Sequence, residues 1–197
     1  MNSVLKENLD KFCTVYLDNI LIYSKNEQEH EQHLCWVPTQ LRAARLKAKR
    51  KKCSSGLPEV EYLGHIVSKD GLKADPAKCK AIADHSPPMS VRELQMFLGT
   101  VNYYSKFVPN YAKICAPLYA LLRKDTPWKW SDEHEMAFRT LQNKLTQPPV
   151  LCLPDFTKPF QLETDSSDFA IGAVLAQQQS DASMRPIAYY SKALISA

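Results

Sequence analysis

The sequence predicts an α+β fold, in which short strands and amphipathic helices follow one another along the chain. Three observations support this prediction. Two β-rich segments, 12–24 and 60–74, contain turn-forming residues typical of hairpins. Capping-box patterns begin a helix after each of them. From residue 150 onward, three further β-rich segments predict another sheet.

The composition is that of a globular protein. Hydrophobic residues make up 45% of the 197 residues and aromatic residues 10%, which is enough to bury a core. No apolar run approaches the length of a membrane span, and the six cysteines stand singly, without an early apolar leader. We therefore expect an intracellular, reducing setting and no membrane partner. The sequence leaves the oligomeric state open.

One strongly basic segment lies between residues 42 and 52. It contains no acid and seven cations: Arg42, Arg45, Lys47, Lys49, Arg50, Lys51 and Lys52. The whole chain carries a net charge of only +4, so the remainder is net acidic. A basic stripe on such a body is typical of a surface that meets phosphates, although a run of this kind is more often a solvated helix face.

The first hairpin is predicted over residues 12–24, with its two strands separated at Asp18 and Asn19, because Asp and Asn tolerate the positive φ of a tight turn. Asn26 followed by Glu29 predicts a helix N-cap with its capping-box partner. Pro38 interrupts the helix that follows. We expect it to kink or split that helix, or to cost about 3 kcal/mol if the helix stays continuous.

The second hairpin is predicted from a strand at 60–67, a turn at 68–71 in which Gly71 supplies a left-handed conformation, and a strand at 72–74. Asp75 and Pro76 then begin a short helix. Ser90 with Glu93 is a well-formed capping box. The later elements are a helix over 91–106, a helix over 112–123, a short strand over 128–130, an amphipathic helix over 132–146, and strands over 160–165, 170–177 and 185–191.

Several motifs occur in a recognisable order along the chain. They are VYLDNILIYS, EHEQHL, KKC, EYLGHIVSKDG, FLGTVNYYSKF, APLYALL, PVLCLPDF and FQLETDSSDFAIGAVLAQ. In order and spacing they resemble the Pol polyprotein of Ty3/gypsy-type long-terminal-repeat retrotransposons. The resemblance implies a reverse transcriptase palm remnant over 1–25, a helical thumb and connection region over 26–147, and the truncated start of an RNase H-like mixed sheet over 148–197.

The resemblance also identifies candidate catalytic residues. Asp18 matches the first of two aspartates at the palm hairpin tip, whereas Asn19 replaces the second, and the family's third aspartate would lie on a strand before residue 1. Asp165 matches the first RNase H carboxylate. Asp18 and Asp165 are thus the candidate ligands of Mg²⁺, an ion that is held chiefly by carboxylate charge. With so few carboxylates, we expect neither polymerase nor RNase H activity from this chain.

Candidate binding residues match the family better. By resemblance, Tyr62, Leu63, Gly64 and His65 form the hairpin that positions the primer end, and residues 91–107 form a thumb helix that lies in the minor groove. Gln95, Gly99 and Tyr103 fall at i, i+4 and i+8, so they share one helix face. A mid-helix glycine costs about 1 kcal/mol relative to alanine. Either close approach of a duplex or packing against a bulky neighbour would explain Gly99.

The function implied by the resemblance is RNA-directed DNA synthesis within a Pol polyprotein. For this chain we expect at most binding of an RNA·DNA hybrid or a primer–template duplex, with Lys49, Arg50, Lys51 and Lys52 as candidate phosphate contacts. Two alternatives stay open at this point. The chain could be a non-catalytic nucleic-acid-binding module that retains the thumb face, or a retroelement relic without activity.

Overall fold

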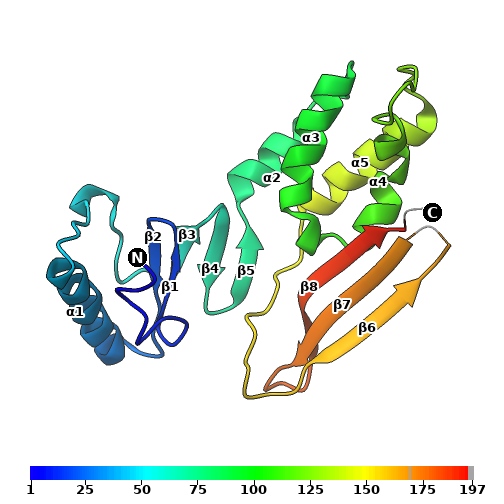
Figure 1. The fold of residues 1–197 in the computed structure, drawn as a ribbon. Helices are drawn as coiled ribbons and strands as arrows, with labels where there is room; N and C mark the ends of the chain where they lie inside the picture. The colour runs from blue at the N-terminus through cyan, green and yellow to red at the C-terminus, as the bar shows by residue number, and fades with distance from the viewer. Residues whose placement is uncertain (169, 195–197) are drawn as a thin grey trace. The chain divides into compact units, whose positions relative to one another are not determined.

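The computed structural model describes residues 1–168 and 170–194. The chain contains two compact units, Met1–Leu63 (unit 1) and Gly64–Ala197 (unit 2). Each unit combines helix with strand (Figure 1), which confirms the α+β prediction.

Unit 1 begins with a hairpin of β1 (Cys13–Tyr16) and β2 (Asn19–Ile22), in which Tyr16 is paired with Asn19. The turn residues are therefore Leu17 and Asp18, and the predicted break at Asp18 and Asn19 is one residue too late. Leu17 has a φ of 54°, a left-handed conformation that is strained for a leucine. The strands, including Cys13, pack on the unit 1 core. This packing sets the register, even though Asn favours turn positions.

Helix α1 (Glu27–Ala43) packs on this hairpin. The Asn26 side-chain oxygen accepts from the Glu29 backbone N–H at 2.9 Å, which confirms the predicted N-cap. The helix continues through Pro38, so the predicted split does not occur. Pro38 is exposed, whereas Val37 and Leu41 are buried, and their burial helps offset the missing backbone hydrogen bond.

The predicted strand over 60–67 is interrupted in the structure. β3 (Glu59–Tyr62) ends unit 1 and β4 (His65–Ser68) begins in unit 2, with Leu63 and Gly64 between them. Leu63 has a φ of 50° and Gly64 a φ of 68°. Two successive positive φ values are those of a type I′ hairpin turn, which usually contains Asn-Gly. The sequence did not predict this turn because its two residues are Leu-Gly.

Strand β5 (Gly71–Ala74) pairs with β4 and with a distant segment of unit 2. The backbone of Leu72 exchanges hydrogen bonds with that of Leu151, at 2.7 and 2.9 Å. A Cβ atom at Gly71 would lie 2.2 Å from the Leu151 carbonyl oxygen. The φ of Gly71 is 131°, outside the left-handed helical region that we predicted. Gly71 is thus required mainly because the backbone at Leu151 approaches it closely.

Four α-helices of unit 2 follow: α2 (Pro76–Ala83), α3 (Val91–Tyr103), α4 (Tyr111–Ala120) and α5 (Asp132–Thr146). The predicted caps are present, since the Asp75 carboxylate accepts from the Ala77 N–H at 2.8 Å and the Ser90 hydroxyl from the Glu93 N–H at 3.3 Å. Helix α3 ends three residues before the predicted boundary, and a 3₁₀ turn, η2 (Ser105–Phe107), follows it.

The core of unit 2 lies between these helices. Its largest fully buried side chains include Phe97, Phe107 and Phe138. The buried Gln142 side chain of α5 donates to the carbonyls of Ile82, Ala83 and His85, at 2.8, 3.0 and 2.8 Å. Because the last carbonyls of a helix lack partners within the helix, this amide satisfies the end of α2 and joins it to α5.

Residues 128–130 are not a strand, so that prediction was wrong. The Trp128 and Trp130 rings stack with centroids 5.9 Å apart and pack against the core of unit 2. The Trp130 Nε1–H donates to the Glu135 carboxylate at 2.8 Å. Side-chain packing on helices, rather than pairing with another strand, therefore explains these tryptophans.

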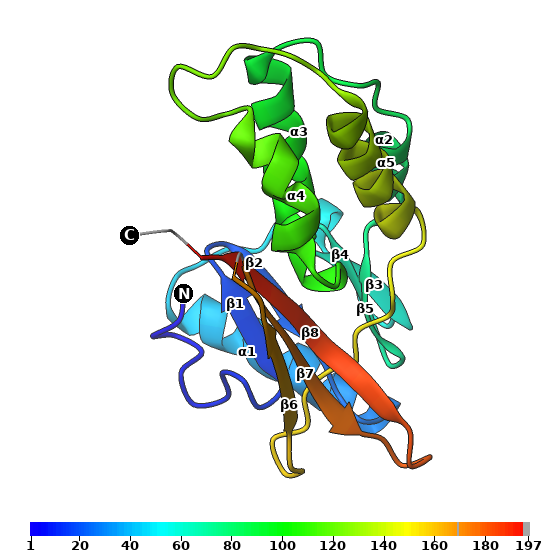
Figure 2. The same cartoon turned by 90° about the vertical axis from the view of Figure 1, so that its right-hand side faces the viewer.

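The predicted C-terminal strands are confirmed as an antiparallel sheet in the order β6 (Gln161–Ser166), β7 (Ala170–Gln178), β8 (Met184–Ala193). Pro186 lies on the edge strand β8 beside a register shift, a position where its missing N–H is tolerated. Helix α4 lies against β8 (Figure 2), and the Ala112 N–H donates to the Ser191 hydroxyl at 3.1 Å.

The close approach at Gly71 predicts the effect of Gly71→Ala. The added methyl group would collide with the Leu151 backbone, so we expect the free energy of unfolding to fall by at least about 2 kcal/mol in urea denaturation. Gly99→Ala is the matched control. A Cβ at Gly99 would meet nothing within 4 Å, so this variant should gain about 1 kcal/mol. A Gly71→Ala variant as stable as the parent would contradict the close approach.

Candidate functional site

The hairpin tip of unit 1 presents Asp18 and Asn19 to solvent. The backbone carbonyl of Asn19 accepts from the Tyr62 hydroxyl at 3.4 Å, so the structure brings two of the predicted site residues together. Burial raises the pKa of the Tyr62 hydroxyl, which keeps it protonated as a donor. This bond anchors the end of β3 to the tip.

The ligands around Asp18 do not fit a two-metal site. Such sites hold divalent ions in a cluster of carboxylates. Within residues 1–168 and 170–194, no three His, Cys, Asp or Glu side chains are grouped closely enough to hold a metal ion. The neighbour of Asp18 at the tip is the neutral Asn19, so Asp18 supplies a single carboxylate there.

Asp165 lies on β6 in a row with Gly172 of β7 and Ser191 of β8. It shares a small cavity of about 70 Å³ with residues of α4, β7 and β8 and with two residues next to α4 and β6: Lys113, Ala170, Gly172 and Ser191, and Asn110 and Ser167. A lysine lines this cavity in place of a second carboxylate. The cavity therefore does not fit the Mg²⁺ site that the resemblance implied.

The predicted binding face of α3 is exposed as expected. Gln95, Gly99 and Tyr103 face solvent, and Tyr103 is 52% exposed. The opposite stripe is buried and contains Leu94, Phe97, Leu98 and Val101. Because a Cβ at Gly99 would meet nothing within 4 Å, Gly99 does not serve packing against a neighbouring helix. Packing against a bulky neighbour therefore does not explain this glycine, and close approach of a duplex stays a prediction.

The turn residue Gly64 is held by the C-terminal end of α3. The buried Tyr104 hydroxyl donates to the Gly64 carbonyl oxygen at 2.9 Å. The Tyr103 ring lies close to Gly64, since its Cε1 atom would be 3.5 Å from a Cβ at that residue. Sequence reasoning selected Tyr103 and missed Tyr104. The adjacent Tyr-Tyr pair was the available signal, because consecutive residues at a helix end point in different directions.

His65 is buried, unlike the other predicted binding residues, and is only 6% exposed. Its ring lies 5.2 Å from that of Tyr103, 5.6 Å from Tyr104 and 5.7 Å from Phe107. Burial lowers the pKa of His65, and the nearby cation of Lys106 lowers it further. Burial also lowers the pKa of Lys106 itself. His65 is thus a neutral ring within an aromatic cluster.

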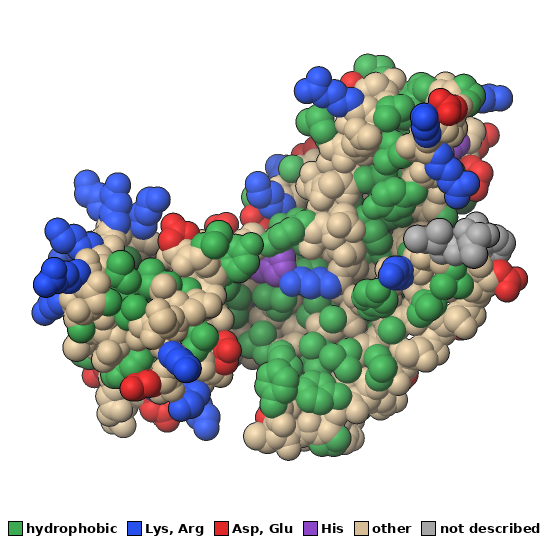
Figure 3. All heavy atoms as spheres, in the orientation of Figure 1, with side chains coloured by type: hydrophobic (Ala, Val, Ile, Leu, Met, Phe, Trp, Pro, Cys, Tyr) green, Lys and Arg blue, Asp and Glu red, His purple; other side chains and the backbone are tan. Residues whose placement is uncertain are grey.

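The basic segment of unit 1 is exposed. Lys and Arg side chains gather over the end of α1 and the chain that follows it (Figure 3), where η1 (Arg50–Lys52) lies. Lys49, Arg50, Lys51 and Lys52 are all exposed. They form a surface of uniform positive charge with which a phosphate backbone could pair.

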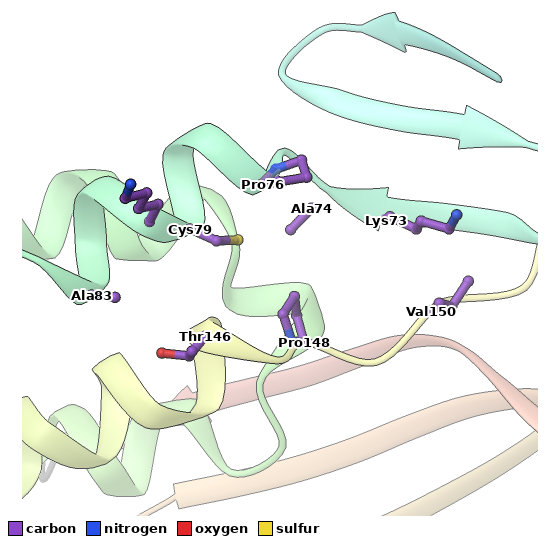
Figure 4. Close-up of a pocket in the computed structure, with 9 residues that line it drawn as sticks. Lys73, Ala74, Pro76, Cys79, Ala83, Thr146, Pro148 and Val150 are labelled. Carbon is purple, nitrogen blue, oxygen red and sulfur yellow. The ribbon is translucent and has the colours of Figure 1, made fainter.

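A second pocket of unit 2, of about 360 Å³, lies between β5, α2 and the end of α5. Ala74, Cys79 and Pro148 converge on it (Figure 4), and its lining is mainly apolar. Burial raises the pKa of the Cys79 thiol, which keeps that sulfur protonated and unreactive. None of the predicted site residues lines this pocket.

No helix in the described parts of the chain is long and apolar enough to cross a membrane.

Two known protein families match the chain. Residues 1–67 match the family described as reverse transcriptase (RNA-dependent DNA polymerase), and residues 130–197 match the RNase H-like domain found in reverse transcriptase. Among curated relatives, the chain is 42% identical over 195 residues to the retrovirus-related Pol polyprotein from transposon 297 of Drosophila melanogaster. It is 38% identical over 191 residues to the transposon Tf2-7 polyprotein of Schizosaccharomyces pombe.

These alignments cover 98% and 97% of this chain but only 18% and 14% of the two polyproteins. Solved structures of the foamy viral protease-reverse transcriptase are also similar. One is in complex with double-stranded DNA, with a TM-score of 0.84, 26% identity, and coverage of 98% of this chain and 33% of that chain. Another is in complex with an RNA/DNA hybrid, with a TM-score of 0.83, 26% identity, and coverage of 98% and 26%.

The buried His65 predicts a pH dependence of stability. Because its pKa is lowered in the folded protein from the ordinary 6.5, the unfolded chain binds more protons just below that pH. The free energy of unfolding should therefore fall as pH decreases through this window. We expect urea denaturation between pH 7 and pH 5 to show a smaller loss for His65→Phe than for the parent. His85→Gln, which removes an exposed histidine, should lose as much as the parent, and an equal loss in all three proteins would contradict the prediction.

Proposed function

The chain belongs to the reverse transcriptases of Ty3/gypsy-type retrotransposon Pol polyproteins, and we propose that it holds a nucleic-acid duplex. It spans the end of the reverse transcriptase domain and an RNase H-like domain. The parent polyprotein would carry out RNA-directed DNA synthesis. The observation that supports a holding role is the exposed face of α3, where Gly99 leaves open space between Gln95 and Tyr103.

Within this proposal the chain has three functional parts. Residues 1–25 contribute the end of the palm, 26–147 the thumb and connection region, and 148–197 the start of the RNase H-like domain. The matched families support the two ends of this division, since they cover residues 1–67 and 130–197.

The partner we propose is a primer–template duplex or an RNA·DNA hybrid. The similar foamy viral enzymes were solved with double-stranded DNA and with an RNA/DNA hybrid. In this chain, the glycine on the α3 face would let the helix backbone approach the duplex closely. Tyr103 and Gln95 on either side would supply an aromatic ring and an amide for contacts in the groove.

Phosphate contacts would come from the basic segment of unit 1. The exposed cations there are Lys49, Arg50, Lys51 and Lys52. Their contacts with phosphates would act through charge alone and would not distinguish one base sequence from another. Binding should therefore weaken with salt, with a slope of roughly 0.9 per phosphate neutralised on duplex DNA.

We also propose that this chain by itself is catalytically inactive. Enzymes of these families generally use divalent metal ions, and we assign Asp18 and Asp165 by resemblance as the metal-binding aspartates of this chain. Neither stands in a carboxylate cluster among the described residues, because Asn19 follows Asp18 and Lys113 lines the cavity at Asp165. Losing direct ligands should cost more than the roughly 10–100-fold typical of changes around a metal site.

The duplex-holding role is tested by fluorescence anisotropy with a labelled primer–template across a salt titration. We expect salt-sensitive binding by the parent and at least about tenfold weaker binding by Gly99→Leu, since a leucine on an exposed face obstructs the duplex without disturbing the fold. Gln95→Ala/Tyr103→Ala should also weaken binding. Ala116→Leu, on an exposed position of α4, is the matched control and should bind like the parent. Equal binding by all four proteins, or none by the parent, would refute the role.

The inactivity is tested with the purified chain on a primed RNA template with dNTPs and Mg²⁺, and on a labelled RNA·DNA hybrid. We expect neither primer extension nor release of labelled RNA. Asn19→Asp should not restore extension, because two neighbouring carboxylates still fall short of the three that the family uses. Extension or RNA release that depends on Asp18 or Asp165 would show that the carboxylates present are sufficient.

A further inference from the structure

We propose that Tyr104, together with the aromatic rings around His65, positions the turn at Gly64 relative to the duplex-binding face of α3. The aromatic clamp, as we name it, consists of His65, Tyr103, Tyr104 and Phe107. It would hold the turn, which by resemblance to the family lies at the primer end, at a constant distance from that face. This inference rests on the proposed duplex-holding function.

The first part of the clamp is the hydrogen bond from Tyr104 to Gly64. Tyr104 is only 2% exposed, and its hydroxyl donates to the Gly64 carbonyl at 2.9 Å, across forty residues of sequence. Gly64 and the preceding Leu63 both have positive φ, a conformation that is strained for leucine. A partly buried hydrogen bond to the backbone at this point disfavours the relaxation of such a turn.

The second part is the burial of His65 directly after the turn. Its ring contacts Tyr103, Tyr104 and Phe107, with centroids between 5.2 and 5.7 Å apart. Edge-to-face and tilted contacts at such distances favour one arrangement of the rings. The first residue of β4 is therefore anchored to the end of α3 by side-chain packing as well as by the Tyr104 bond. Lys106, whose amine lies 5.6 Å from the Phe107 ring centroid, adds a cation beside the cluster.

The third part is Tyr103, which belongs both to the clamp and to the exposed face. It is 52% exposed in line with Gln95 and Gly99. Its hydroxyl oxygen and Cε1 atom also lie 3.7 and 3.5 Å from where a Cβ of Gly64 would stand. A duplex that contacts Tyr103 would thus lie beside the turn. All members of the clamp, and Gly64 itself, belong to unit 2.

The test uses a primer–template whose 3′-terminal primer base is 2-aminopurine, together with a fluorescein label for anisotropy. Tyr104→Phe removes the hydroxyl and keeps the ring, so we expect an affinity within about twofold of the parent. The change in 2-aminopurine fluorescence on binding should fall about fivefold, as expected from the loss of one hydrogen bond that favours the positioned state. Tyr190→Phe, which removes an exposed hydroxyl on β8, should retain the full signal.

The outcomes separate the two proposals. If the parent does not bind the duplex, the proposed function fails. If the parent and Tyr104→Phe bind with the same terminal signal, or the parent binds with no terminal signal, the clamp is overturned while duplex holding stands. Should Tyr104→Phe fail to fold, Gly64→Ala decides, because it keeps Tyr104 and strains the turn through its positive φ. It should show the same selective loss of the terminal signal, and an unchanged signal would overturn the clamp.

Discussion

Burial of one stripe of α3 is the constraint on which the rest of unit 2 depends. Leu94, Phe97, Leu98 and Val101 are all 2% exposed or less. Because helical periodicity couples the two faces of a helix, burial of this stripe leaves Gln95, Gly99 and Tyr103 in solvent. The same burial brings the end of the helix, with Tyr104 and Phe107, against the turn at Gly64. The exposed face and the anchored turn are therefore two consequences of one packing arrangement.

The residues proposed for duplex binding and those proposed for catalysis have different surroundings. The α3 residues proposed to contact a duplex are exposed, and they lie on a helix whose opposite stripe is buried. Metal sites have a different requirement, since several charged ligands must converge on one point. Among the described residues, neither Asp18 nor Asp165 belongs to a group of side chains that could hold a metal ion. The exposed α3 face and the lack of a carboxylate cluster among the described residues support the proposal that this part of the polyprotein holds nucleic acid.

Local signals in the sequence predicted much of the fold. The caps at Asn26, Asp75 and Ser90 were confirmed, because a side-chain oxygen next to unpaired N–H groups acts within a few residues. The errors occurred where distant contacts decide. The turn at Leu63 and Gly64 was missed because Leu-Gly is an unusual pair for it, and the strand at Trp128 was wrong because those rings pack on helices. Helix α1 continues through Pro38 because Val37 and Leu41 are buried. The periodicity of the sequence alone does not show whether this burial outweighs the free-energy cost of the proline.

By itself the sequence determined the family, the helices with their caps, the C-terminal strands and the exposed line of Gln95, Gly99 and Tyr103. These follow from periodicity and from interactions between residues close in the chain. Only the tertiary structure decided that Gly71 lies against Leu151, that Lys113 lines the cavity of Asp165, and that His65 is buried among aromatic rings instead of facing a ligand. Each of these joins segments far apart in sequence, and such contacts depend on how whole elements pack, which no local pattern encodes.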